Sequence, residues 1–113
     1  MERTARIDKE IKRLNRIFKD IGKDKRDAVK SLINNAAFMA ITLEDLQAHI
    51  NEHGCVSQYQ NGENQWGSKK SPEVDIHIAM TKNHTAVMRQ LADLLPRIDA
   101  GEGSDIMDFI NSK

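Results

Sequence analysis

The sequence predicts a mainly helical, all-α protein with one short β-hairpin at the tip of an antiparallel helical hairpin. Two long stretches repeat apolar residues every three or four positions, which is the period of one helix face. Between them lies the polar segment YQNGENQWGSKKSP, from Tyr59 to Pro72, in which Asn-Gly and Ser-Pro interrupt the helical pattern. At 113 residues the chain has the length of about one domain, so these elements form a single small unit.

Charge is distributed unevenly along a chain whose formal net charge is zero. Residues 1 to 30 contain 11 basic and 6 acidic side chains, whereas residues 31 to 113 contain 6 basic and 11 acidic ones. This asymmetry predicts a basic element that meets phosphate and an acidic body that does not. The alternative is that the basic residues form only a solvated helix face.

The chain carries few signals for a particular compartment. Cys55 is the only cysteine, so no internal disulfide is expected. The sequence is charged from Glu2 onward, and its longest apolar run is the six residues Ala36 to Ile41. We therefore expect neither a signal peptide nor a transmembrane helix, and predict a cytoplasmic protein.

Residues 1 to 23 are predicted to form a basic, amphipathic N-terminal helix that stops at Gly22. One face is cationic, and together with the turn after it this face is the candidate DNA-binding surface, because basic side chains bind the phosphate backbone. The apolar stripe consists of Ile7, Ile11, Leu14, Phe18 and Ile21. The candidate DNA-binding residues are Lys12, Arg13, Arg16, Lys19, Lys23, Lys25, Arg26 and Lys30.

Residues 24 to 96 are predicted to form the helical hairpin, which is also the oligomerisation core. Its first helix starts with Asp24 as N-cap and ends near Gly54. Thr42 and Asp45 have the spacing of a capping box, which predicts a kink there. The apolar seam has coiled-coil spacing and comprises Val29, Leu32, Ala36, Met39, Leu43, Leu46 and Ile50.

The tip, residues 55 to 67, is predicted to be a β-ribbon. Strands 55–60 and 64–67 pair across Asn61-Gly62, the dipeptide best suited to a two-residue turn. Because an isolated two-stranded ribbon is marginal in water, we expect it to pack on a neighbouring helix or subunit. Its ring side chains, Tyr59 and Trp66, join the candidate oligomerisation residues.

A third helix is predicted to start at Ser71-Pro72, with serine as cap and proline at the first helical position, and to end before Pro96. Residues 97 to 113 are predicted to be a flexible, acidic C-terminal tail that contains Gly101 and Gly103. Its apolar residues are candidate partner contacts: Ile106, Met107, Phe109 and Ile110.

Catalytic motifs are absent from the sequence. There is no phosphate-binding Gly-Lys-Ser/Thr loop, no dinucleotide fingerprint and no nucleophile elbow, so we expect neither an enzyme nor a cofactor. His49, His53 and Cys55 have a spacing that can bind zinc, but they lack a fourth ligand. We therefore favour helix-end or surface roles for these side chains and predict no metal site.

Residues 28 to 96 resemble the small subunit of tailed-phage terminases, the non-catalytic DNA-recognition component of the genome-packaging motor. The resemblance is carried by four segments. These are INNAAFM and TLEDLQ in the second helix, SQYQNGENQWGSKKSPE at the tip and KNHTAVMRQLADLLP in the third helix, with a basic helix ahead of them.

The resemblance implies an oligomeric ring that binds double-stranded viral DNA at the packaging start region. It also implies that the ring delivers this DNA to the terminase large subunit, which carries the ATPase and nuclease. A C-terminal segment commonly contacts that subunit, and residues 98–111 match its position. Unlike many relatives, this chain has no room for a separate helix-turn-helix domain. The alternatives are a dimeric DNA-binding regulator and a structural or adaptor protein that does not bind DNA.

Overall fold

A computed structural model describes residues 2–60, 62–63 and 65–96. The described elements are the helix α1 (Arg3–Ile17), the short 3-10 helix η1 (Lys23–Lys25), α2 (Arg26–His53), the strands β1 (Val56–Gln60) and β2 (Trp66–Lys70), and α3 (Pro72–Leu94). The two strands form one antiparallel sheet. The predicted fold class, mainly helical with a short two-stranded β-hairpin, is confirmed.

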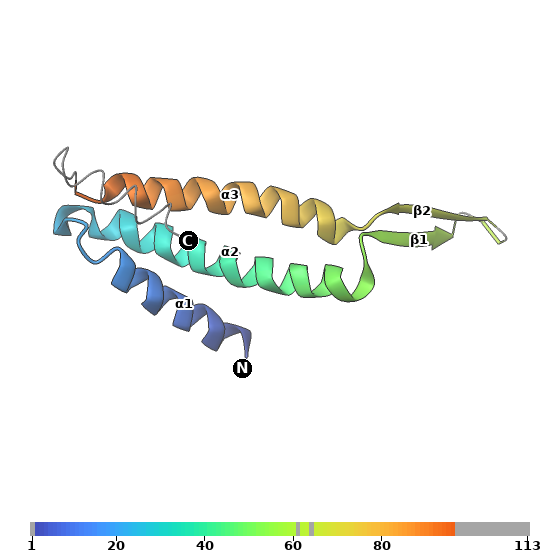
Figure 1. Cartoon of the computed structure of the whole chain (residues 1–113), viewed down its shortest axis with the longest axis horizontal. Helices are drawn as coiled ribbons and strands as arrows, with labels where there is room; N and C mark the ends of the chain where they lie inside the picture. Colours follow the sequence, from blue (N-terminus) through green and yellow to red (C-terminus); the bar gives the residue numbers. More distant parts are fainter. Residues whose placement is uncertain (1, 61, 64, 97–113) are drawn as a thin grey trace, which may run out of the picture.

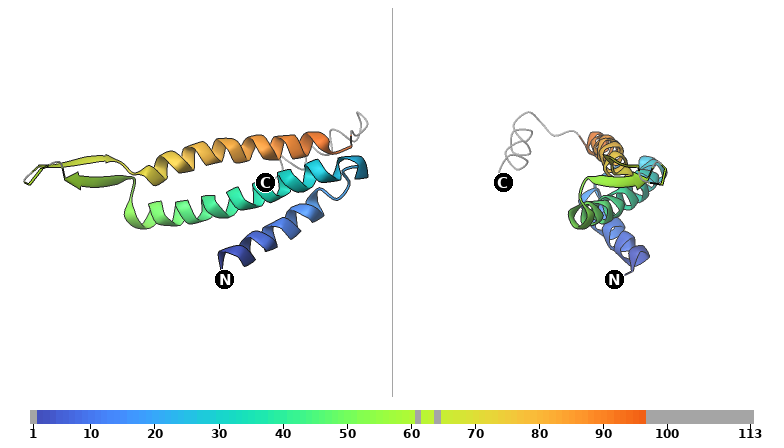
Figure 2. Two further views of the ribbon diagram at one scale, coloured as in Figure 1. Left: turned by 180° about the vertical axis from the view of Figure 1, so that it is seen from behind. Right: turned by 90° about the vertical axis from the view of Figure 1, so that its right-hand side faces the viewer.

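The molecule is long and narrow, with extents of 67 × 29 × 23 Å. α2 lies between α1 and α3, and α2 and α3 run side by side in opposite directions (Figures 1 and 2). α1 lies along only the first part of α2. The ribbon formed by β1 and β2 projects beyond the opposite end of α2 and α3 (Figure 1). One end of the molecule is therefore a three-helix unit and the other a thin ribbon.

The core lies at the three-helix end. Ala36 and Ala37 have no exposed surface, and such small side chains let neighbouring helices approach α2 closely. The predicted apolar stripe of the first helix is confirmed, because all of its members belong to this core or pack against it. The buried cluster consists of Leu14, Phe18, Ile33, Ala36, Ala37 and Leu91.

The first helix ends earlier than predicted, at Ile17 rather than at Gly22. The Phe18 N–H still donates to the Leu14 carbonyl at 2.9 Å, and the Ile21 N–H then donates to the Phe18 carbonyl at 3.3 Å. This turn brings Phe18 and Ile21 against the same core while the chain reverses direction. Burial of these two side chains in the three-helix unit favours the turn over continuation of the helix.

The prediction that Asp24 caps the second helix is wrong. Asp24 lies inside η1, and α2 begins at Arg26 with Lys25 in the N-cap position and no side-chain cap hydrogen bond. The Lys25 N–H donates to the Gly22 carbonyl at 3.0 Å. A tight 3-10 turn therefore leads directly into α2, which removes the need for a side-chain cap.

The capping-box pattern at Thr42 and Asp45 does not start a new helix, since α2 is continuous from Arg26 to His53. Both side chains instead accept hydrogen bonds from Arg3 in α1. The two residues of the capping-box pattern therefore accept hydrogen bonds from a neighbouring helix instead of capping α2.

Gly54 ends α2 as predicted, with φ 81° and ψ −176°. This backbone conformation is accessible almost only to glycine. We expect Gly54→Ala to lower the free energy of unfolding by ~1–3 kcal/mol, measured by urea unfolding. A Cβ at this position would have no neighbour within 4 Å, so the cost comes from the backbone alone.

Cys55 provides a matched control, because peptides can be joined at a Gly-Cys junction by native chemical ligation. A semisynthetic chain with D-alanine at position 54 carries the same methyl group but prefers positive φ. This chain should keep the stability of the unmodified protein. Equal destabilisation by both alanines would show that the methyl group itself, and not the backbone, causes the loss.

The ribbon has a different register from the predicted one. A two-residue Asn-Gly turn would pair Gln60 with Glu63, whereas the structure pairs Gln60 with Trp66. The ladder starts at its base, where the Ser71 N–H donates to the Cys55 carbonyl at 2.9 Å. The ends of α2 and α3 therefore set the register, and residues 61–65 are left to connect the strands.

The prediction allowed the ribbon to pack on a neighbouring helix or on a neighbouring subunit. The ribbon does not pack along the helices of its own chain (Figure 1). Val56 and Trp66 lie on the same face of the ladder and are 58% and 66% exposed. The ribbon thus exposes two apolar side chains on one face. We still predict that this face contacts a neighbouring subunit, because an isolated two-stranded ribbon is marginal in water.

The predicted restart at Ser71-Pro72 is confirmed, with Ser71 at the N-cap position of α3 and Pro72 in its first turn, but the Ser71 side chain makes no cap hydrogen bond. The buried Ser71 hydroxyl donates to the Glu73 carboxylate, and this hydrogen bond lowers the pKa of Glu73. α3 ends at Leu94, two residues before Pro96, as the sequence predicts. Among the described helices, none combines the length and the hydropathy that a bilayer span requires.

Candidate nucleic-acid interface

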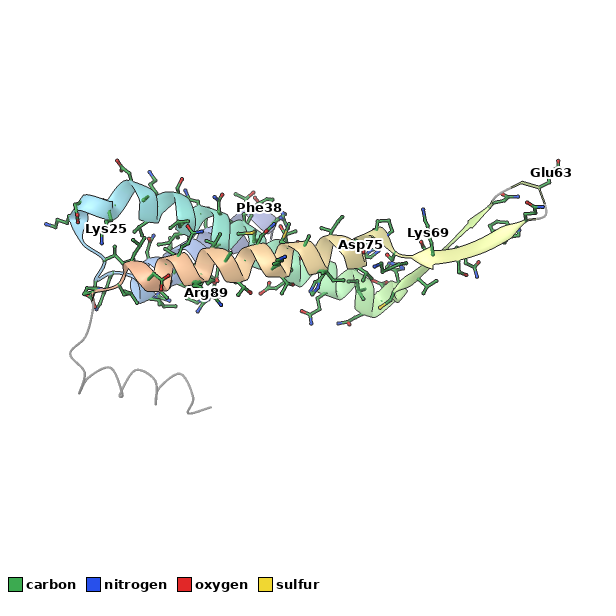
Figure 3. The ribbon with its side chains drawn as sticks, turned by 90° about the horizontal axis from the view of Figure 1, so that it is seen from above. Lys25, Phe38, Glu63, Lys69, Asp75 and Arg89 are labelled. Atoms are coloured by element: carbon green, nitrogen blue, oxygen red, sulfur yellow. The ribbon has the colours of Figure 1, made fainter. Side chains whose placement is uncertain are left out.

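The predicted DNA-binding residues gather at the end of the molecule opposite the ribbon. They come from α1, from the turn after it, from η1 and from the first turns of α2, and all are solvent-exposed. Figure 3 shows Lys25 at this end and Glu63 at the far tip. The structure therefore brings Lys12, Arg13, Arg16, Lys19, Lys23, Lys25, Arg26 and Lys30 to one corner, which we call the basic corner.

One residue of the basic corner is already paired. Arg13 donates to both carboxylate oxygens of Glu10, at 2.7 and 2.8 Å, and this contact lowers the pKa of Glu10. The other seven cations form no ion pair with another described residue. Their charge is therefore available to an external anion such as a DNA phosphate.

Arg3 and Arg6 hold the other end of α1 on α2, a role that sequence analysis missed. Arg6 donates to Asp45 at 2.7 Å and to Glu44 at 2.8 Å, and Arg3 donates to Asp45 at 2.6 Å. Arg3 also lies over the ring of Phe38, 5.2 Å from its centre. The sequence contains two arginines one helical turn apart and the adjacent acids Glu44 and Asp45. Nothing in the sequence indicates that these arginines and acids contact each other.

This network makes stability depend on acid pH. Hydrogen bonds from Arg6 and then Arg3 lower the pKa of Asp45 in the folded protein. Such a carboxylate stabilises the fold above its unfolded pKa of about 3.9, and loses this contribution as pH falls through the folded pKa. We expect Asp45→Asn to cost about 1 kcal/mol or less at pH 7, because these groups are partly exposed, and nothing at a pH well below 4.

Thermal unfolding of Asp45→Asn and the wild type from pH 7 down to pH 3 checks this expectation. Asp93→Asn is the matched control, since Asp93 is an exposed carboxylate on α3 that pairs with no described residue. A stability difference for Asp45→Asn that stayed constant with pH would contradict an ionic origin.

The basic corner contains a groove of about 330 Å³ between the second half of α1, the turn after it and the start of α2. Its walls carry Lys19, Arg26 and Lys30, and its floor is apolar, with Phe18, Val29 and Ile33. On the other side of α1, a second groove of about 310 Å³ mixes basic side chains with Glu10 and Glu44. Among the described residues, both grooves contain unpaired cations and a buried apolar side chain, but only the first has no acidic side chain in its lining.

The predicted oligomerisation seam falls partly inside the chain. Ala36 is fully buried within the core, and Val29 and Leu32 pack against it. Tyr59 is opposite Gly67 in the ribbon, and Trp66 is exposed. The remaining seam residues are partly exposed on α2: Met39, Leu43, Leu46 and Ile50.

His49 and His53 stack with ring centres 4.4 Å apart. His49 Nε2 lies 3.6 Å from a Glu73 oxygen, and Cys55 is exposed. In the described ranges, no group of three or more histidine, cysteine or acidic side chains has metal-binding geometry. The histidines thus lie at the surface where α2 ends beside the start of α3.

The candidate partner-binding residues Ile106, Met107, Phe109 and Ile110 lie outside the described residues. Searches of protein families, of curated protein sequences and of solved structures find no match for this chain.

Proposed function

We propose that this chain is a terminase small subunit that binds double-stranded DNA through the basic corner. The observation that carries the DNA-binding proposal is the gathering of seven exposed cations without ion partners among the described residues. In contrast, Arg3 and Arg6, also on α1, are paired with acids of α2. A neutral chain whose first 30 residues carry an excess of basic side chains is suited to contact with phosphates.

Binding of this kind is positional rather than sequence-specific. Phosphate contacts fix a protein on the duplex, whereas sequence is read from base edges in the grooves. Lysine and arginine dominate the basic corner, which supports backbone contact. In this proposal many weak phosphate contacts, joined in one ring, hold the DNA with an avidity that comes from effective concentration.

The ring itself is supported by apolar surface that α1 does not cover. Half-exposed or more exposed apolar side chains occur on α2, on the ribbon and on α3, and such surface marks interaction sites. The assignment to terminases rests on the sequence resemblance over residues 28 to 96, and with it come the large subunit as partner and the host cytoplasm as location. The exposed side chains are Phe38, Val56, Trp66, Ile76 and Ile78.

Two other functions compete with this one. A dimeric DNA-binding regulator would also use the basic corner, but would form a two-fold assembly on discrete palindromic sites. A structural or adaptor protein would share the exposed apolar surface and be indifferent to DNA. Subunit number and salt-dependent DNA binding together separate the three.

Native mass spectrometry at moderate salt, paired with fluorescence anisotropy on a labelled duplex, is the test. We expect a discrete high-order ring and an affinity that falls linearly with the logarithm of salt concentration. A dimer that binds DNA would support the regulator. A chain whose affinity for DNA is undetectable even at low salt would contradict DNA binding and favour the adaptor.

A further inference from the structure

The groove at the basic corner has the surface of a peptide-binding site. Its floor is formed by Phe18, Val29 and Ile33, and Lys19 and Lys30 stand on its walls with Arg26. A volume of about 330 Å³ is at the lower end of the ~300–1,000 Å³ typical of ligand pockets. An apolar floor between unpaired cations fits an occupant that is both apolar and acidic.

The second groove differs from the first in its acidic lining. There Arg6 pairs with Glu44 and Arg13 pairs with Glu10, so two of its four cations are compensated within the chain. No described residue pairs with Lys19, Arg26 or Lys30 in the first groove. An acidic ligand therefore gains more from the first groove than from the second.

A segment with the complementary chemistry occurs in the same chain. Residues 104 to 111, SDIMDFIN, place Ile106, Phe109 and Ile110 at the spacing of one helix face. Asp105 directly precedes Ile106, and Asp108 directly precedes Phe109. The segment matches the groove in both properties: apolar side chains for the floor and carboxylates for the walls.

The described part of the chain ends close to the groove. Leu95, just past the end of α3, packs against the same core cluster as Ile21 and Val29, which line the groove. From Pro96 the chain has the seven residues 97 to 103 before the segment begins. An extended chain of that length spans up to ~23 Å, which is enough to turn back onto a surface beside its own origin.

We propose that residues 104 to 111 dock in the groove of their own chain, with the apolar side chains on the floor and Asp105 and Asp108 facing Lys19 and Lys30. The docked segment covers three cations of the basic corner. As a consequence that rests on the proposed function, it competes with DNA, and a partner that captures the segment frees the corner.

Carbodiimide cross-linking of the full chain, followed by peptide mass spectrometry, tests the docking without DNA. This reagent joins a lysine amine to a carboxylate in direct contact. We expect cross-links from Asp105 or Asp108 to Lys19 or Lys30. The full-length variant Phe109→Ser/Ile110→Ser should reduce their yield about tenfold or more, since burial of each large apolar side chain is worth at least a tenfold change in the equilibrium.

The matched control is Ile76→Ser/Ile78→Ser, which removes two exposed apolar side chains from α3 and should leave the cross-links unchanged. Both variants are first checked for wild-type helicity by circular dichroism. A second control uses labelled and unlabelled chains that are unfolded and refolded together. We expect only same-label cross-links, because the segment belongs to its own chain.

Three results would overturn the proposal. The first is absence of the cross-links, and the second is an equal yield in the Phe109→Ser/Ile110→Ser variant. The third is a high yield of mixed-label cross-links, which would place a second copy's segment in the groove. Because none of these involves DNA, a failure here leaves the proposed function to its own test.

Discussion

Removal of three cations from the basic corner, by Lys12→Gln, Arg16→Gln and Lys23→Gln in one variant, should weaken duplex DNA binding on the order of a hundredfold at 0.1 M salt. Each phosphate contact contributes ~0.9 to the slope of log affinity against log salt concentration, so three lost contacts lower the slope by up to ~2.7 per subunit. These residues are exposed and pair with no described residue, and they lie outside the α1–η1–α2 groove. Fluorescence anisotropy over a range of salt concentrations measures both quantities.

The matched control removes three positive charges elsewhere, by Lys70→Gln, Lys82→Gln and Arg89→Gln. These residues lie on β2 and α3, away from the basic corner. The two variants have the same net charge, so a general loss of attraction to DNA affects both equally. If the control lost as much affinity as the test variant, the basic corner would not be the binding surface.

Leu91→Ala should lower the free energy of unfolding by ~2–5 kcal/mol. Leu91 has no exposed surface and is the one residue of α3 in the buried cluster, where it meets Leu14 and Phe18 of the first helical segment and Ile33 of α2. Truncation leaves a cavity at the point where the three helices meet. In a core this small, the neighbouring side chains have few alternatives for filling it.

Urea unfolding at a fixed protein concentration measures this loss, since oligomerisation makes stability depend on concentration. Gln90→Ala is the matched control on the same helix, because Gln90 is exposed and its truncation should cost less than about 0.5 kcal/mol. Equal losses for the two variants would contradict a burial cost specific to Leu91.

The basic corner shows how far the sequence leads to a site. The cationic face of the first helix was visible in the sequence, and the structure places those residues together. Sequence analysis did not single out Arg13 as paired, although Glu10 lies three residues earlier on the same helix and this spacing favours an ion pair. Nor could it reveal the groove, whose lining comes from three elements that meet only in the folded chain.

The sequence by itself determined the elements, the end of α2 and both limits of α3. Apolar residues at helical spacing made α1 amphipathic, Gly54 ended α2 with a backbone conformation that only glycine tolerates, and Ser71-Pro72 started α3. These are local effects of periodicity, backbone strain and capping, which act between residues close in the chain.

Only the tertiary structure decided the rest. Phe18 and Ile21 gain more from burial than from continuing α1, so the helix ends early. Asp45 accepts hydrogen bonds from α1 instead of capping a new helix, because Arg3 and Arg6 reach it across the fold. The ribbon takes its register from the helix ends beneath it rather than from Asn61-Gly62, since pairing begins where α2 and α3 already hold the strands together.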